Sequence, residues 1–166
     1  MLTNQTPLQE HLLNVYYYTS DGMLRSCKND KAVSCALIVM DGQKLHIKKH
    51  RAIFAMHHGY LPEIVDHINR NTADNRIENL RPATASMNNC NKVISPTNTS
   101  GYAGVDSVFR EGRIQYTAHI HIDGIRTRIG TYPTAAEAFD AYYDALVQKA
   151  GQYAPAKEML MADWVK

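Results

Sequence analysis

The sequence of 166 residues is short of the features that mark several large protein classes. Its three cysteines, Cys27, Cys35 and Cys90, are odd in number and widely spaced, with no Cys-x-x-Cys pair to nucleate a zinc site. No apolar run approaches the ~20 residues of a membrane span, and no basic start followed by an apolar segment opens the chain. We therefore expect a soluble, unexported protein of a reducing cytoplasm, with no membrane partner and no structural zinc.

The chain also has little excess of either charge. The chain has 18 Lys and Arg against 16 Asp and Glu, which gives a formal net charge of +2. A surplus this small does not by itself indicate a nucleic-acid-binding protein, so any such binding must come from the local arrangement of charge. The length predicts one domain by default and is sufficient to bury a core.

Side chains that carry chemistry gather in the middle third of the chain. An apolar run at residues 61–65 predicts a short strand that ends beside Asp66 and His67. A loop of residues that favour turns then follows, with Asn69, Asn71, Asp74 and Asn75. The pattern therefore predicts an aspartate and a histidine held at the start of a polar loop.

A short helix is predicted after this loop. Thr84 is a suitable N-cap for a helix over about residues 85–93, in which Asn88 and Asn91 share a face. Carboxylate and amide oxygens, completed by water, are ligands that Mg²⁺ prefers. The spacing alone leaves two interpretations open, a magnesium site and an Asn-rich surface loop whose histidine only packs.

A known family resembles this segment along its whole length. The HNH endonuclease motif, in the variant common among phage homing endonucleases, is similar without a gap to VDHINRNTADNRIENLRPATASMNNCN at residues 65–91. The resemblance implies a ββα-metal (His-Me finger) fold in which His67 is the general base. It also implies that Asp66 and Asn88 hold one Mg²⁺ or Mn²⁺ ion.

The same resemblance implies further site residues. Asn79 would fix the loop that orients His67, and Asn91 falls on the last asparagine of the motif, where its role is open. The pair His50 and Arg51 resembles the segment that precedes the motif and packs behind or beside the site. Arg51 has two interpretations, a phosphate contact and a buried structural partner.

The preceding residues predict a small supporting structure. An amphipathic helix is expected at residues 7–15, hairpins at 16–24 and 36–47, and a helix at 50–58. Asp41 and Gly42 form the second turn, and Gly59 ends the second helix. His57 and His58 are neighbours on that helix and point about 100° apart, which disfavours a shared metal ion.

The composition changes again after a linker at residues 95–100. Three strands are expected at residues 102–110, 114–122 and 125–132, with turns at Glu111-Gly112 and Asp123-Gly124. A helix should follow over residues 134–150, started by a capping box of Thr134 and Glu137. Its apolar stripe is suited to cover one face of the sheet.

Alternation along the strands assigns a polar set to the uncovered face. The candidate DNA-binding residues there and at the first turn are Arg110, Arg113, Gln115, His119, His121, Arg126 and Arg128. A β-ribbon with arginines is one of the elements that enter the major groove of DNA, where arginine pairs with guanine. The pattern is also compatible with a solvated sheet whose arginines only confer solubility.

A second family resembles the C-terminal part. The Apetala-type DNA-binding domain of plant ethylene-response factors, also found in many phage HNH endonucleases, is similar to NTSGYAGV, AHIHIDGIRTRIGTYPTAAEAFDAYYDA and GQYA within residues 98–154. Two positions depart from the plant pattern. Asp106 replaces the usual arginine and Arg128 replaces the usual tryptophan, so the plant target sequence does not transfer.

Together these features predict an α+β protein. The expected parts are a ββα-metal nuclease domain at residues 1–94 with its core at about 61–93, a three-stranded antiparallel sheet packed on one helix at 101–154, and a tail at 155–166. The expected function is site-selective hydrolysis of double-stranded DNA with one divalent metal and a histidine base, as in a homing endonuclease.

Other functions stay open at this point. They are a DNA-binding regulator with an inactive nuclease fold and a structure-selective or restriction-type nuclease.

Overall fold

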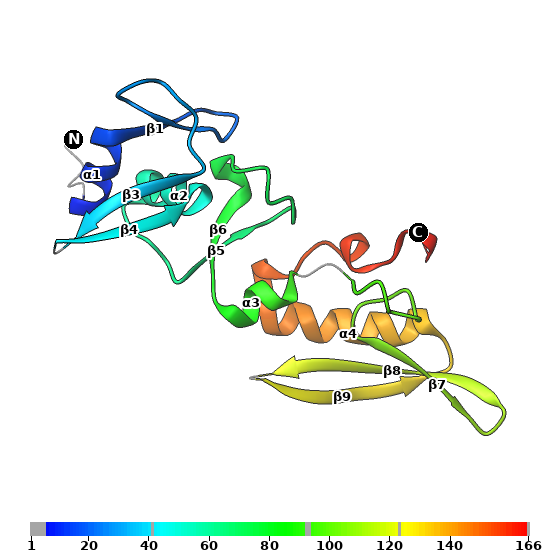
Figure 1. The fold of residues 1–166 in the computed structure, drawn as a ribbon. Helices are drawn as coiled ribbons and strands as arrows, with labels where there is room; N and C mark the ends of the chain where they lie inside the picture. The colour runs from blue at the N-terminus through cyan, green and yellow to red at the C-terminus, as the bar shows by residue number, and fades with distance from the viewer. Residues whose placement is uncertain (1–5, 41, 92–93, 123, 166) are drawn as a thin grey trace. The chain divides into compact units, whose positions relative to one another are not determined.

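Figure 1 shows a computed structural model of the chain, which describes residues 6–40, 42–91, 94–122 and 124–165. The chain divides into two compact units, Met1–Thr84 and Ala85–Lys166, and each is described by itself. The expected turn residues Asp41 and Asp123, and residues 92–93 of the expected helix, lie outside the described residues. Across the described ranges, every helix is too short or too polar to cross a membrane.

The first unit combines helices with short paired strands. Its elements are α1 (Pro7–Val15), β1 (Tyr16–Tyr18), β2 (Leu24–Ser26), β3 (Cys35–Met40), β4 (Gln43–Lys48), α2 (Lys49–His58), β5 (Ile64–His67), the 3₁₀ helix η1 (Ile77–Asn79) and β6 (Leu80–Ala83). The described strands pair as β1-β2, β3-β4 and β5-β6, all antiparallel. The predicted helices and both predicted hairpins of this unit are confirmed.

The core of this unit forms around α2. Ile53 and Phe54 are fully buried on this helix, which Gly59 ends with a φ of 80°. Burying a side chain of this size contributes ~1.5–3 kcal/mol. Val65 of β5 and Leu80 of β6 belong to the same cluster. The core therefore holds the strand pair that carries Asp66 and His67.

The strand β6 differs from expectation. The sequence predicts only an apolar anchor at Leu80, but Leu80–Ala83 pairs with all of β5. Pro82 lies opposite Val65 and obscures the strand pattern. A proline is tolerated there because, among the described strands, β6 pairs with β5 alone, so the missing N–H breaks no second ladder.

The second unit is one sheet with a long helix. Its elements are α3 (Ala85–Cys90), β7 (Val105–Arg110), β8 (Arg113–Ile122), β9 (Ile125–Tyr132), α4 (Ala135–Ala150) and the 3₁₀ helices η2 (Gly151–Tyr153), η3 (Lys157–Leu160) and η4 (Asp163–Val165). The strands run in the order β7-β8-β9, and Figure 1 shows α4 lying along the sheet. The capping box of Thr134 and Glu137 is confirmed.

One face of this sheet packs on α4. The buried cluster includes Ala118 and Ile120 of β8 with Phe139 and Leu146 of α4. Leu160 of the C-terminal tail is 1% exposed and joins the same cluster, so the tail packs on this unit. The opposite face of the sheet carries polar side chains.

The strand β7 begins later than expected, and the helix α3 ends earlier. β7 begins at Val105 because Gly104, with a φ of 71°, interrupts extended backbone before it. The helix α3 ends at Cys90. The division into units falls before α3, while the predicted domain bounds at residues 94 and 101 stay a prediction.

Candidate functional site

Asp66 and His67 are the last two residues of β5. The register pairs Asp66 with Arg81 and His67 with Leu80. Asp66 is 6% exposed and His67 is 7% exposed. Buried polar groups need hydrogen-bond partners, so the contacts of these two side chains define what they can do.

The partner of His67 is Asn75. The Nε2 atom of His67 lies 3.1 Å from Oδ1 of Asn75, a residue that is 2% exposed. The Asn75 amide is oriented by its Nδ2, which donates to the carbonyl oxygen of Ala73 at 2.9 Å. Because an amide oxygen only accepts, Nε2 of a neutral His67 carries the proton and Nδ1 carries the lone pair. The geometry thus gives His67 the tautomer in which Nδ1 is the base.

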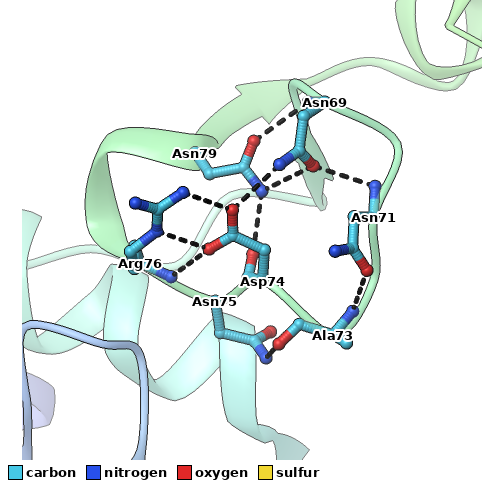
Figure 2. A network of polar contacts seen from close by, with 7 residues as sticks. All are labelled: Asn69, Asn71, Ala73, Asp74, Asn75, Arg76 and Asn79. Atoms are coloured by element: carbon cyan, nitrogen blue, oxygen red, sulfur yellow. Dashed lines mark hydrogen bonds and ion pairs between the residues drawn. The ribbon is translucent and has the colours of Figure 1, made fainter.

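Asn79 lies at the end of the loop that runs from His67 to β6, and Figure 2 shows its contacts with Asn69 and Asp74. Its Oδ1 accepts from the backbone N–H of Asn69 at 2.9 Å, and its Nδ2 donates to Oδ1 of Asn69 at 2.9 Å and to the carbonyl oxygen of Asp74 at 2.8 Å. Its own carbonyl oxygen accepts from the N–H of Ile68 at 2.9 Å. One buried amide therefore joins the start of the loop to its far side.

Side chains of the loop satisfy its backbone. Oδ1 of Asn69 accepts from the N–H of Asn71 at 2.8 Å, and Oδ1 of Asn71 accepts from the N–H of Ala73 at 3.0 Å (Figure 2). Arg76 donates through Nε and Nη2 to Asp74 at 2.8 and 2.7 Å, and this pairing lowers the pKa of the Asp74 carboxyl. The loop is fixed by its own polar groups.

Asp66 forms an ion pair across the strands. Nε and Nη2 of Arg81 each lie 2.9 Å from Oδ2 of Asp66. A cation bound to Asp66 would therefore share this carboxylate with Arg81 or displace the guanidinium. The donor chemistry of a carboxylate with an amide suits Mg²⁺ or Mn²⁺. Within the described ranges, no three His, Cys, Asp or Glu side chains gather as a set that could hold a metal.

His50 and Arg51 lie beside this strand pair. The ring centroids of His50 and His67 are 5.0 Å apart. Burial, followed by the charges of His67 and neighbouring lysine and arginine, lowers the pKa of His50 to about 4. Arg51 donates to the carbonyl oxygens of Glu63 at 2.6 Å and Pro62 at 3.1 Å. These contacts favour the structural interpretation of Arg51, which holds the turn before β5.

Asn88 and Asn91 belong to the second unit. Asn88 lies on α3. Asn91 is buried and comes directly after the end of this helix. The structure brings Asp66, His67 and Asn79 together within the first unit. A place for Asn88 or Asn91 in the same metal site stays a prediction.

The predicted DNA-binding residues share the open face of the sheet. The register sets Arg110 against Arg113, His119 against Arg128 and His121 against Arg126, and directly opposed residues share a face. A β-bulge after Ala118 absorbs Ile129 and keeps both arginines of β9 on this face. Gln115, paired with Val108, lies there as well.

Three residues with defined contacts are absent from the sequence-based site. Asn75 contacts His67, Arg81 contacts Asp66, and Asp106 lies on the open sheet face opposite Thr117. Asn75 carries no signal of its own because the sequence marks it only as a turn former. Arg81 becomes a candidate only when β6 is recognised as the partner of β5.

A solved structure and a protein family are similar to this chain. Among solved structures, the chain is similar to one described as "DNA binding and cleavage by the HNH homing endonuclease I-HmuI", with a TM-score of 0.35 and 20% identity over 82% of this chain and 85% of that chain. No curated protein matches the sequence. The sequence model of a family described as HNH endonuclease matches residues 48–90, the segment from the end of β4 to the end of α3. Residues 48–90 are therefore similar to the HNH endonuclease family.

Proposed function

We propose that this protein is a site-selective endonuclease that hydrolyses phosphodiester bonds of double-stranded DNA, of the homing type. His67 acts as the general base, and Asp66 and Asn88 hold one divalent cation in a ββα-metal arrangement. The open face of the β7-β8-β9 sheet positions the DNA. The observation that carries the proposal is the contact of Nε2 of His67 with the oriented amide oxygen of Asn75, inside the segment that matches the HNH endonuclease family.

The proposed hydrolytic step uses Nδ1 of His67. This atom takes a proton from a water molecule aligned with the scissile phosphate, while the Nε2–H stays on Asn75. Asn79 acts by position only, since it holds the loop that carries Asn75. When bound, Mg²⁺ or Mn²⁺ would neutralise the extra negative charge of the transition state and stabilise the leaving oxygen.

DNA positioning is assigned to the arginine-bearing face. Arginine and polar side chains project from all three strands, and the face opposite them is covered by α4. A sheet face of this kind can contact base edges and phosphates in a major groove.

A nicking assay tests the proposal. Supercoiled plasmid or a random DNA library is incubated with the protein and Mg²⁺, and the cut ends are sequenced. We expect His67→Ala to lose roughly 100- to 10,000-fold in cleavage rate with DNA affinity nearly unchanged, the range for removing a general base. His57→Ala, which removes an exposed histidine of the same unit, is the matched control. A joint collapse of binding and rate in His67→Ala would contradict the assigned role.

The ion pair of Asp66 with Arg81 favours a second candidate. A carboxylate already neutralised by arginine is compatible with a DNA-binding regulator whose nuclease fold is inactive. Metal-dependent nicking by the unaltered protein excludes the regulator, and DNA binding without nicking in Mg²⁺ or Mn²⁺ supports it.

A further inference from the structure

Asp106 places a carboxylate on the open sheet face among arginine and histidine. It projects from β7, and Arg126 projects from β9, so the two residues lie on opposite sides of the central strand β8. Nη2 of Arg126 nevertheless donates to Oδ2 of Asp106. Both side chains are about half exposed, at 52% and 51%, so the pair lies at the surface that DNA would meet.

His119 of β8 contacts both Arg126 and Asp106. Its Nδ1 lies 3.2 Å from Nη2 of Arg126 and 3.4 Å from Oδ2 of Asp106. Burial and the positive charge of Arg126 lower the pKa of His119, which favours the neutral ring with Nδ1 as an acceptor. Two acceptors on two strands therefore hold one nitrogen of the guanidinium.

This arrangement affects which DNA group Arg126 can bind. A carboxylate beside the guanidinium cancels its charge and repels a phosphate. A guanidinium has five N–H donors. Among the described residues, the hydrogen bonds of Arg126 all use Nη2. A paired contact with O6 and N7 of guanine uses two neighbouring nitrogens, one of which is Nη2. It therefore keeps the bond to Asp106 and replaces the bond to the neutral ring of His119. An arginine that is already ordered also loses less side-chain freedom on binding.

Arg128 provides a comparison on the same strand. Its Nη2 donates to the neutral hydroxyl Oγ1 of Thr131. Its charge is therefore not cancelled by this partner and suits a phosphate, which neither favours nor rejects any base. The two arginines differ in chemistry although they are two residues apart.

We infer that Asp106 makes Arg126 a base-contacting residue that selects guanine, while Arg128 binds the DNA backbone. The inference rests on the proposed function, in which the open face of the sheet contacts DNA. Asp106 is then a specificity-determining residue that acts through Arg126. Its expected effect is exclusion of non-specific phosphate binding.

Selection from a random DNA library tests this inference, followed by titration of the selected and scrambled duplexes at several salt concentrations. We expect Arg126→Ala to abolish a guanine preference at one position, a discrimination of roughly 5- to 150-fold. Asp106→Asn should relax the same position, strengthen binding to scrambled DNA and steepen the salt dependence by about one phosphate contact. Arg128→Ala should weaken binding to both duplexes by a similar factor and make the salt dependence shallower.

The control variants distinguish the effect of Asp106 on Arg126 from the loss of one negative charge anywhere on this unit. Asp140→Asn removes one negative charge from α4, where Asp140 pairs with Lys157, so it should leave the guanine preference intact. In the Arg126→Ala background, Asp106→Asn should cause no further loss of preference. An additive loss, relaxation at a different position, or an unchanged preference in Asp106→Asn would overturn the inference while DNA binding stands. Failure of the unaltered protein to bind any DNA would overturn the proposed function as well.

Discussion

At the scale of single residues, the contact between Asn75 and His67 determines which nitrogen can act as a base. We expect Asn75→Asp to move the acid limb of the pH profile for cleavage to higher pH, because a carboxylate beside Nε2 favours the imidazolium. Asn75→Ala removes the acceptor and should lower the rate by about 10- to 100-fold, as is typical for partners that orient a histidine. Cleavage rates measured between pH 5 and pH 9 give both results.

Asn71→Asp is the control for this pair of substitutions. It makes the same charge change in the same loop, and its Oδ1 can still accept from the N–H of Ala73. If the acid limb moved equally in Asn71→Asp, the shift would come from loop charge and not from the contact with His67.

His50 makes the folding stability of the first unit depend on pH. Its pKa is lowered to about 4, while an unfolded histidine titrates near 6.5. Between these values the unfolded state binds more protons, so this contribution to stability is present above about pH 6.5 and is lost as the pH falls toward 4. Since His50 is only partly buried, we expect a loss of about 1–2 kcal/mol, below the full linkage value.

Urea unfolding at pH 7 and pH 4.5 measures this contribution to the free energy of unfolding. His50→Gln should lose less stability than the unaltered protein over that interval, whereas His121→Gln, at an exposed position, should behave as the unaltered protein does. Equal losses in all three proteins would contradict the assignment.

At the scale of elements, the turn between β1 and β2 supports the polar loop of the site. A Cβ added to Gly22 would lie 2.5 Å from the backbone nitrogen of Arg76 and the backbone carbon of Asn75, and Gly22 has a φ of 81°. We expect Gly22→Ala to cost more than ~1–2 kcal/mol of stability, the penalty for a left-handed conformation alone, and to slow cleavage by displacing Asn75. Thermal unfolding and the nicking assay measure the two effects.

Gly112→Ala separates conformational strain from displacement. Gly112 has a φ of 76°, and a Cβ there would meet none of the described residues within 4 Å. It should lose stability through strain and keep its cleavage rate. A similar loss of rate in both variants would show that the close approach of Gly22 is unimportant.

Elements with strong local signals could be predicted from the sequence, and those set by tertiary contacts could not. Pro7, Gly59 and the capping box at Thr134 mark helix ends through backbone chemistry, and the predicted helices have these ends. The strand β6 contains Pro82 and is recognisable only through its pairing with β5. The contacts of Asn75 and Arg81 depend on that pairing and on the folded loop, so spacing alone did not reveal them.

At the scale of the whole molecule, the two proposed tasks belong to different compact units. His67 lies in the first unit, and Arg128 lies on the sheet of the second. Substitutions at independent sites add in free energy, whereas substitutions within one network do not. We therefore expect His67→Ala to lower kcat, Arg128→Ala to raise KM, and the double variant to show the product of the two effects on kcat/KM.

A second double variant makes this expectation specific. Asn79 holds the loop that carries Asn75, the partner of His67, so Asn79→Ala and His67→Ala act on one network. Once His67 is absent, Asn79→Ala should cause little further loss of kcat, because orienting a missing base has no effect. Steady-state kinetics on a plasmid with one cut site measures both pairs. Strong non-additivity between His67 and Arg128 would contradict the separation of hydrolysis from DNA positioning, and it would indicate that the sheet also orders the hydrolytic site.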